Sequence, residues 1–198
     1  MKKVAFVVSH LGSESEELVR ILNENPRVVI YPKDRVYTHP TDLDWLFEHG
    51  HKLDNAAAVY GNHLLHNASF TSKSLYEICK FIYLIRPAKP SINIIQTENY
   101  TAHTACRYYC FRLRRICEMA KRTPKAVFLT WQDLADGRGQ ILIERYLNLK
   151  NPLGPVSFSE PTEDETPPEL IEQAQDSYER YYYYLNQQDL QSVNKSLD

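Results

Sequence analysis

Short apolar runs, each closed by turn residues, are the feature that most constrains how this chain can fold. The clearest of them lie at residues 4–8, 27–31, 81–85 and 126–130, and a weaker, alanine-rich one lies at 56–65. An apolar run of this length is typical of a strand that is buried on both faces of a parallel sheet. The sequence therefore predicts a central sheet that water does not reach from either side.

Segments with helical spacing separate these runs. Leu18, Ile21 and Leu22 recur at the period of a helix, which we expect to end near Asn25-Pro26 because the residue before a proline leaves the α region. Further helices are expected at about 41–50, 98–122 and 141–149. Strands that alternate with helices predict an α/β fold in which helices flank a central parallel sheet.

The chain is expected to have one main domain, residues 1–155, and a helical C-terminal extension, residues 156–198. Residues 151–168 hold five prolines and an acidic run, which favours an extended connection. A helix follows from Glu169 to about Gln188, and five of the 14 tyrosines lie in it between Tyr178 and Tyr184. We expect this tyrosine-rich helix to pack on the main domain, although a partner surface is an alternative use.

Composition excludes several classes of protein. The 198 residues carry 23 basic and 25 acidic side chains, a net charge of −2, which gives no general attraction to nucleic acid. Neither a signal sequence nor a run of membrane-spanning length is evident, and the four cysteines do not form a disulfide framework. We therefore expect a cytoplasmic protein with no membrane or nucleic-acid partner and no metal, and the oligomeric state stays open.

Three polar segments follow predicted strands, at residues 9–15, 31–34 and 86–93. In open parallel sheets, ligands bind at the carboxyl ends of the strands, so these segments are expected around one crevice. The first contains Gly12 and several serines before a helix, which suits an anion, although an ordinary capped helix start is the alternative. Arg86 would enter the crevice as a bidentate phosphate ligand or, alternatively, form a salt bridge.

Taken together, the segments resemble the PAPS-dependent sulfotransferases, which transfer a sulfuryl group from 3′-phosphoadenosine 5′-phosphosulfate. The family's phosphate loop and the helix that ends in a His-Pro-like pair correspond to residues 9–15 and Asn25-Pro26. Its lysine, strand, Arg-Pro and serine segment corresponds to 80–93, and its last strand and helix motifs correspond to 130–134 and 146–149. The motifs stand in the family's order along roughly residues 3 to 150.

The resemblance implies a P-loop-NTPase-like sulfotransferase fold and transfer of a sulfuryl group from PAPS to a hydroxyl or amine of a small-molecule or glycan acceptor. It implies that the 5′-phosphosulfate is held by His10, Gly12, Ser13 and Ser15. It implies that the 3′-phosphate is held by Arg86 with Ser91 or Asn93. Asp34 is the expected base, and His39 is its reserve.

The phosphate loop departs from the family pattern at one point. Its residues 9–15 contain no lysine or arginine, whereas the family usually places a basic residue there. The alternative is therefore a non-catalytic binding domain that has kept the fold and lost the cofactor.

Overall fold

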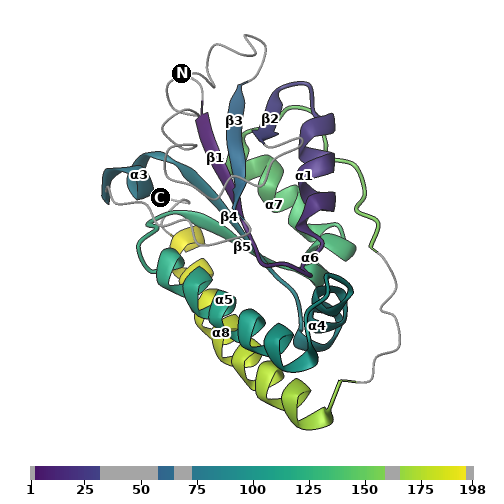
Figure 1. Ribbon diagram of the computed structural model, residues 1–198. Coiled ribbons are helices and arrows are strands. Elements are labelled where there is room, and N and C mark those ends of the chain that lie inside the picture. Colours follow the sequence, from purple (N-terminus) through teal and green to yellow (C-terminus); the bar gives the residue numbers. More distant parts are fainter. Residues whose placement is uncertain (1–2, 32–57, 65–72, 159–165, 195–198) are drawn as a thin grey trace.

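A computed structural model describes residues 3–31, 58–64, 73–158 and 166–194 of the chain (Figure 1). Its centre is a five-stranded sheet with the strand order β2-β3-β1-β4-β5, in which every pairing is parallel. The strands are β1 (Lys3–Val8), β2 (Val28–Tyr31), β3 (Val59–Leu64), β4 (Lys80–Ile85) and β5 (Ala126–Thr130). All five predicted strands are thus confirmed, including the alanine-rich one.

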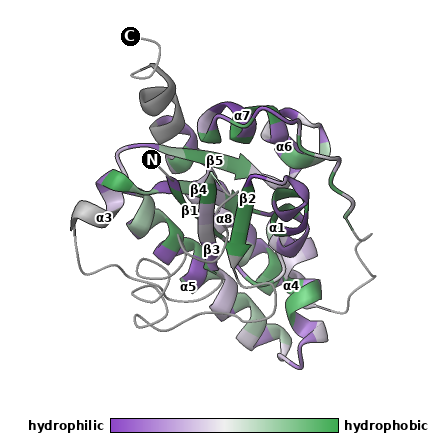
Figure 2. Ribbon diagram, turned by 90° about the horizontal axis from the view of Figure 1, so that it is seen from above, coloured by the Kyte–Doolittle hydropathy of each residue, from purple (hydrophilic) through white to green (hydrophobic). Residues whose placement is uncertain are grey.

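Helices cover both faces of the sheet, as predicted. One face carries α3 (Lys73–Ile78), α4 (Ala88–Thr97), α5 (Ala102–Ala120) and α8 (Pro168–Asn194). The other face carries α1 (Ser15–Glu24), α6 (Trp131–Ala135) and α7 (Arg138–Leu147). Seen from above, the strands lie between α5 on one side and α7 on the other (Figure 2).

The two faces of the sheet bury different side chains of the same strands. In β1, Phe6 and Val8 face the α5 side, whereas Ala5 and Val7 face the α1 side. All four are fully buried. This alternation explains why the run is apolar at every position: side chains of a strand point to opposite faces, and here both faces are covered.

The strand order fixes where the chain can build a site. The chain leaves β1, crosses to β2 through α1 and returns to β3, but β4 then lies on the other side of β1. The order of the strands therefore reverses between β1 and β4. Residues that follow these two strands meet at the carboxyl edge of the sheet, where parallel folds bind ligands.

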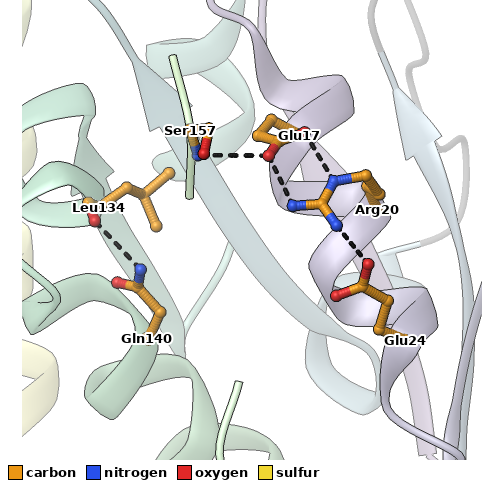
Figure 3. Close-up of polar contacts among 6 residues, drawn as sticks. All are labelled: Glu17, Arg20, Glu24, Leu134, Gln140 and Ser157. Atoms are coloured by element: carbon orange, nitrogen blue, oxygen red, sulfur yellow. Dashed lines mark hydrogen bonds and ion pairs between the residues drawn. The ribbon is translucent and has the colours of Figure 1, made fainter. Parts of the chain in front are cut away.

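The segment 151–158 is extended and lies against the α1 side of the molecule. Its side chains Leu153, Val156 and Phe158 pack against the apolar cluster of that face. Figure 3 shows the backbone N–H of Ser157 donating to Glu17 Oε1 over 3.2 Å, while Glu17 also accepts from Arg20 on the next turn of α1.

The C-terminal helix α8 runs beside α5 (Figure 1). Ala174 is fully buried there, and Tyr178 and Leu185 are almost fully buried within the same cluster as α5. Tyr183, by contrast, is 67% exposed. Among the described helices, none is long and apolar enough to cross a membrane.

Candidate functional site

The loop between β1 and α1 turns sharply under the first turn of α4. The N–H of Ser13 donates to the carbonyl of His10 over 3.1 Å, and Gly12 and Glu14 both have positive φ, at 82° and 55°. A Cβ on Gly12 would lie 2.3 Å from the carbonyl oxygen of Ser91. The loop therefore needs glycine at this position for its backbone conformation and for its close approach to α4.

Arg86 follows β4 directly and reaches the same loop. Its side chain is 1% exposed, and Nη1 donates to Glu14 Oε2 over 2.5 Å and to the carbonyl of Gly12 over 3.4 Å. The guanidinium also lies 5.1 Å from the centroid of the Trp131 ring. Arg86 thus reaches the predicted crevice, and there it forms a salt bridge, the alternative to phosphate binding that the sequence left open.

His10 uses both ring nitrogens inside the protein. The N–H of Arg86 donates to Nε2 over 3.1 Å, so the proton is on Nδ1, which lies 2.9 Å from the carbonyl of Leu11. Burial lowers the pKa of His10 to about 4, against the opposing effect of the Leu11 bond. The ring is therefore neutral at pH 7, and it ties the loop to the end of β4 rather than offering a positive charge.

Two serines at the ends of the loop share one imidazole. Ser9 Oγ and Ser15 Oγ lie 2.7 Å apart, and His63 Nε2 lies 3.0 Å from the former and 2.8 Å from the latter. His63 comes from the end of β3, and both serines are fully buried. The hydroxyl of Ser15 at the start of α1 is thus already held in a fixed direction.

A buried arginine supports the loop from the α5 side. Arg112 is 1% exposed; its Nε donates to the carbonyl of Ser9 over 2.9 Å and its Nη2 to that of Leu64 over 2.8 Å. It therefore joins the ends of β1 and β3. Burial lowers the pKa of Arg112 to about 10, which still leaves it charged at pH 7.

The remaining predicted ligands lie on the loop and on α4. Ser13 is fully buried, and its Oγ has no hydrogen-bond partner within the described residues. Ser91 Oγ donates to the carbonyl of Pro87 over 2.8 Å, and Asn93 is buried two residues further along α4. Ser13 is thus the predicted ligand whose hydroxyl is still available.

The structure brings most of the predicted cofactor residues to one edge of the sheet, around the close contact of Gly12 with α4. Asp34 and His39, the predicted base and its reserve, lie outside the described residues. Three contributors were missed from the sequence: Arg112, His63 and Glu14 as the partner of Arg86. For Arg112 a signal existed, because it stands three residues after the buried Tyr109 and four before the buried Ile116.

A cavity of about 510 Å³ opens between α5 and the start of α8. Aromatic side chains line it, namely Tyr100, Tyr108 and Phe111. The hydroxyl oxygen of Tyr108 accepts a hydrogen bond from the N–H of Leu11 over 3.3 Å, which connects the wall of the cavity to the loop. Polar side chains line the cavity as well, namely His103, Thr104, Arg107 and Gln173, so it is a mixed hollow of the surface.

Comparison with solved structures gives a fold relative. The chain resembles the mouse sulfotransferase SULT7A1, which was solved in complex with PAP, with a TM-score of 0.54 and 13% sequence identity. The match covers 88% of this chain and 64% of that sulfotransferase. No family model and no curated protein matches the sequence. The chain therefore has a sulfotransferase-like, P-loop-NTPase-like α/β fold with a helical C-terminal region.

Proposed function

We propose that this chain transfers a sulfuryl group from PAPS to a hydroxyl or amine acceptor. The observation that carries the proposal is the meeting of the β1–α1 loop with Arg86 and α4 at the strand-order reversal, in a fold like that of a PAP-bound sulfotransferase. PAPS would supply the activated sulfuryl group, and the protein's part would be to bind, orient and stabilise charge.

The loop residues are assigned to the 5′ end of the nucleotide. Ser13 would donate its buried hydroxyl, Gly12 lets the backbone turn close to α4, and Ser15 starts the helix whose N-terminus favours anions. His10 would act by holding the loop against β4, since both its nitrogens are engaged. The unsatisfied Ser13 hydroxyl is the feature that fits an absent ligand.

The 3′-phosphate is assigned to Arg86 with Ser91 and Asn93. For this to occur, Arg86 must exchange the carboxylate of Glu14 for the phosphate. Both are anions that accept charge-assisted hydrogen bonds, so the exchange keeps the buried guanidinium paired. Asp34, with His39 in reserve, is proposed as the base that takes the acceptor's proton.

The acceptor is proposed to bind in the aromatic cavity of α5. Phenols and aryl amines would stack on the aromatic walls formed by Tyr100, Tyr108 and Phe111, and the polar lining residues would contact their hydroxyl or amine. A screen with labelled PAPS over phenols, aryl amines and sugars tests this choice. Preferred transfer to sugars would contradict it.

Calorimetric titration with adenosine 3′,5′-bisphosphate tests the proposed function directly. We expect the nucleotide to bind and, at 100 times Kd, to stabilise the fold by about 2.7 kcal/mol, a rise in melting temperature of roughly 5–10 °C. Arg86→Ala should weaken the bisphosphate by about tenfold or more, with adenosine 5′-monophosphate unchanged, because only the bisphosphate carries the 3′ group. Absence of binding at millimolar nucleotide would reject the proposal.

The second candidate is a binding domain that has lost the cofactor, and the Glu14–Arg86 ion pair favours it. Glu14→Gln separates the two functions. In a working nucleotide site, the substitution releases Arg86 and tightens bisphosphate binding. In a domain that has lost the cofactor, the substitution leaves the protein without nucleotide affinity.

A further inference from the structure

The β1–α1 loop contains no lysine or arginine, yet the guanidinium of Arg112 contacts its backbone. Arg112 reaches from α5 to the carbonyls of Ser9 and Leu64. Ser9 is the first residue of the loop, so the guanidinium is in contact with the loop backbone at the point where it leaves β1.

Among the residues that the structure describes, no acid neutralises this cation. Within residues 3–31, 58–64, 73–158 and 166–194, no carboxylate pairs with Arg112, and its Nη1 has no hydrogen-bond partner. Arg86, the other fully buried arginine near the loop, is paired with Glu14. A buried charge without a counter-ion is costly, and two carbonyl oxygens compensate it only in part.

The positive charge of Arg112 affects the titration of a loop residue, His10. Burial is the main cause that lowers the pKa of His10, and the positive charges of Arg112 and Arg86 lower it further, as expected for cations close to this loop residue. The side chains of Arg112 and His10 are both buried, so the field of the guanidinium is screened less than between charges at a surface.

We propose that Arg112, from α5, supplies the positive charge that the β1–α1 loop lacks. This charge would make the loop a site for a phosphate or sulfate group. The inference rests on the proposed function, because its ligand is the anion assigned there to the loop. Arg112 is a positioning residue, since it keeps its two carbonyl partners and acts on the anion through the loop.

The rival explanation is a purely structural clasp that joins the ends of β1 and β3. The two explanations differ in what the positive charge does. Arg112→Lys keeps the charge but loses the planar fork, and Arg112→Gln keeps a donor but loses the charge. Arg114→Gln is the matched control, because Arg114 lies on the same helix with its side chain 69% exposed.

The experiment titrates each variant with inorganic pyrophosphate and with adenosine 3′,5′-bisphosphate, by calorimetry on the folded protein. We expect Arg112→Gln to weaken both ligands by about tenfold or more and Arg112→Lys by about threefold or less, with Arg114→Gln unchanged. Equal affinities in Arg112→Gln and the wild type would overturn the proposal in favour of the clasp.

A second measurement uses the unmodified protein, in case Arg112→Gln does not fold. The Nε–H resonance of Arg112, assigned by comparison with Arg112→Lys, should shift as pyrophosphate is added, while that of Arg114 stays in place. No shift at saturating anion would overturn the proposal.

The two probes separate this inference from the proposed function. Pyrophosphate binding that depends on Arg112, without nucleotide binding, supports the inference and rejects the sulfotransferase function. Nucleotide binding that ignores Arg112 supports that function and rejects the inference. Binding of neither probe rejects both.

Discussion

Burial keeps the His10 ring neutral in the folded protein, and this makes the free energy of unfolding depend on pH under acidic conditions. Burial holds its folded-state pKa at about 4, below the ordinary 6.5. Between these two values the unfolded chain binds a proton that the folded chain does not, so stability must rise with pH across this window and fall on acidification. A shift of this size corresponds to about 3 kcal/mol.

Urea unfolding at pH 7 and at pH 4.5 measures this effect. We expect the wild type to lose part of that roughly 3 kcal/mol on acidification, and His10→Gln to lose correspondingly less. Gln offers an oxygen to the N–H of Arg86 but does not titrate. An equal loss in both proteins would mean that other groups carry the acid sensitivity.

The proposed base gives the second prediction for a single residue. Asp34→Asn keeps the size of the side chain but cannot accept a proton, so turnover should fall by about 10²–10⁴-fold, or roughly 3–5 kcal/mol of barrier. Nucleotide affinity should hardly change, because the base acts on the acceptor. His39→Ala is the companion variant: if it is inactive while Asp34→Asn turns over normally, the reserve residue is the base.

Single residues also mark the limit of prediction from the sequence. Arg86 was expected in the crevice because an arginine at the end of a buried strand must enter it. Its partner Glu14 could not be foreseen, since the two are separated by 72 positions and Glu14 lies in a loop where its φ is positive. Contacts of this kind depend on the assembled fold and leave no periodic pattern in the chain.

Elements were more predictable than residues. The run of residues 81–85 was expected as a strand, and β4 (Lys80–Ile85) matches it because a strand buried on both faces is apolar throughout.

Residues 130–134 were interpreted as a family motif, and in the structure they also start α6. There Thr130 and Asp133 form a capping box, with Thr130 N–H donating to Asp133 Oδ2 over 2.8 Å.

The contact between the β1–α1 loop and α4 can be tested with a pair of glycines. Gly12 and Gly137 have similar φ values of 82° and 78°, but a Cβ on Gly137 meets nothing within 4 Å. Gly137→Ala should therefore cost about 1–2 kcal/mol for the left-handed backbone alone. Gly12→Ala should cost about 3 kcal/mol or more, because its Cβ must also displace the backbone of Ser91.

Thermal or urea unfolding of both variants measures the difference. The excess cost of Gly12→Ala reports how firmly the loop is seated on α4, and the variant should also bind adenosine 3′,5′-bisphosphate less tightly. Similar costs for the two variants would show that the loop moves away from α4 easily, which would weaken the assignment of both to one site.

At the scale of the whole molecule, the sequence left open whether the main domain and the C-terminal helix unfold as one unit. The proline-rich residues 151–168 indicated a division near residue 155, with α8 as an extension. Yet residues 151–158 pack on the α1 face and α8 packs on the α5 face, so the chain crosses from one side of the sheet to the other. Apolar contacts of both segments with the core predict one cooperative unit.

Two substitutions on α8 decide whether the extension and the domain unfold together. Ala174 is fully buried against the core, so Ala174→Arg forces a charge into the contact and should destabilise the whole protein by about 3–5 kcal/mol. Tyr183 is 67% exposed, so Tyr183→Arg should change stability by less than about 0.5 kcal/mol. Urea unfolding followed by far-UV circular dichroism and by tryptophan fluorescence measures both. A Trp45→Phe background leaves Trp131, at the start of α6 on the opposite face, as the fluorescent reporter. If Ala174→Arg leaves the fluorescence transition where it was and lowers only part of the helical signal, α8 is a separately stable extension, and the division near residue 155 describes two independent units.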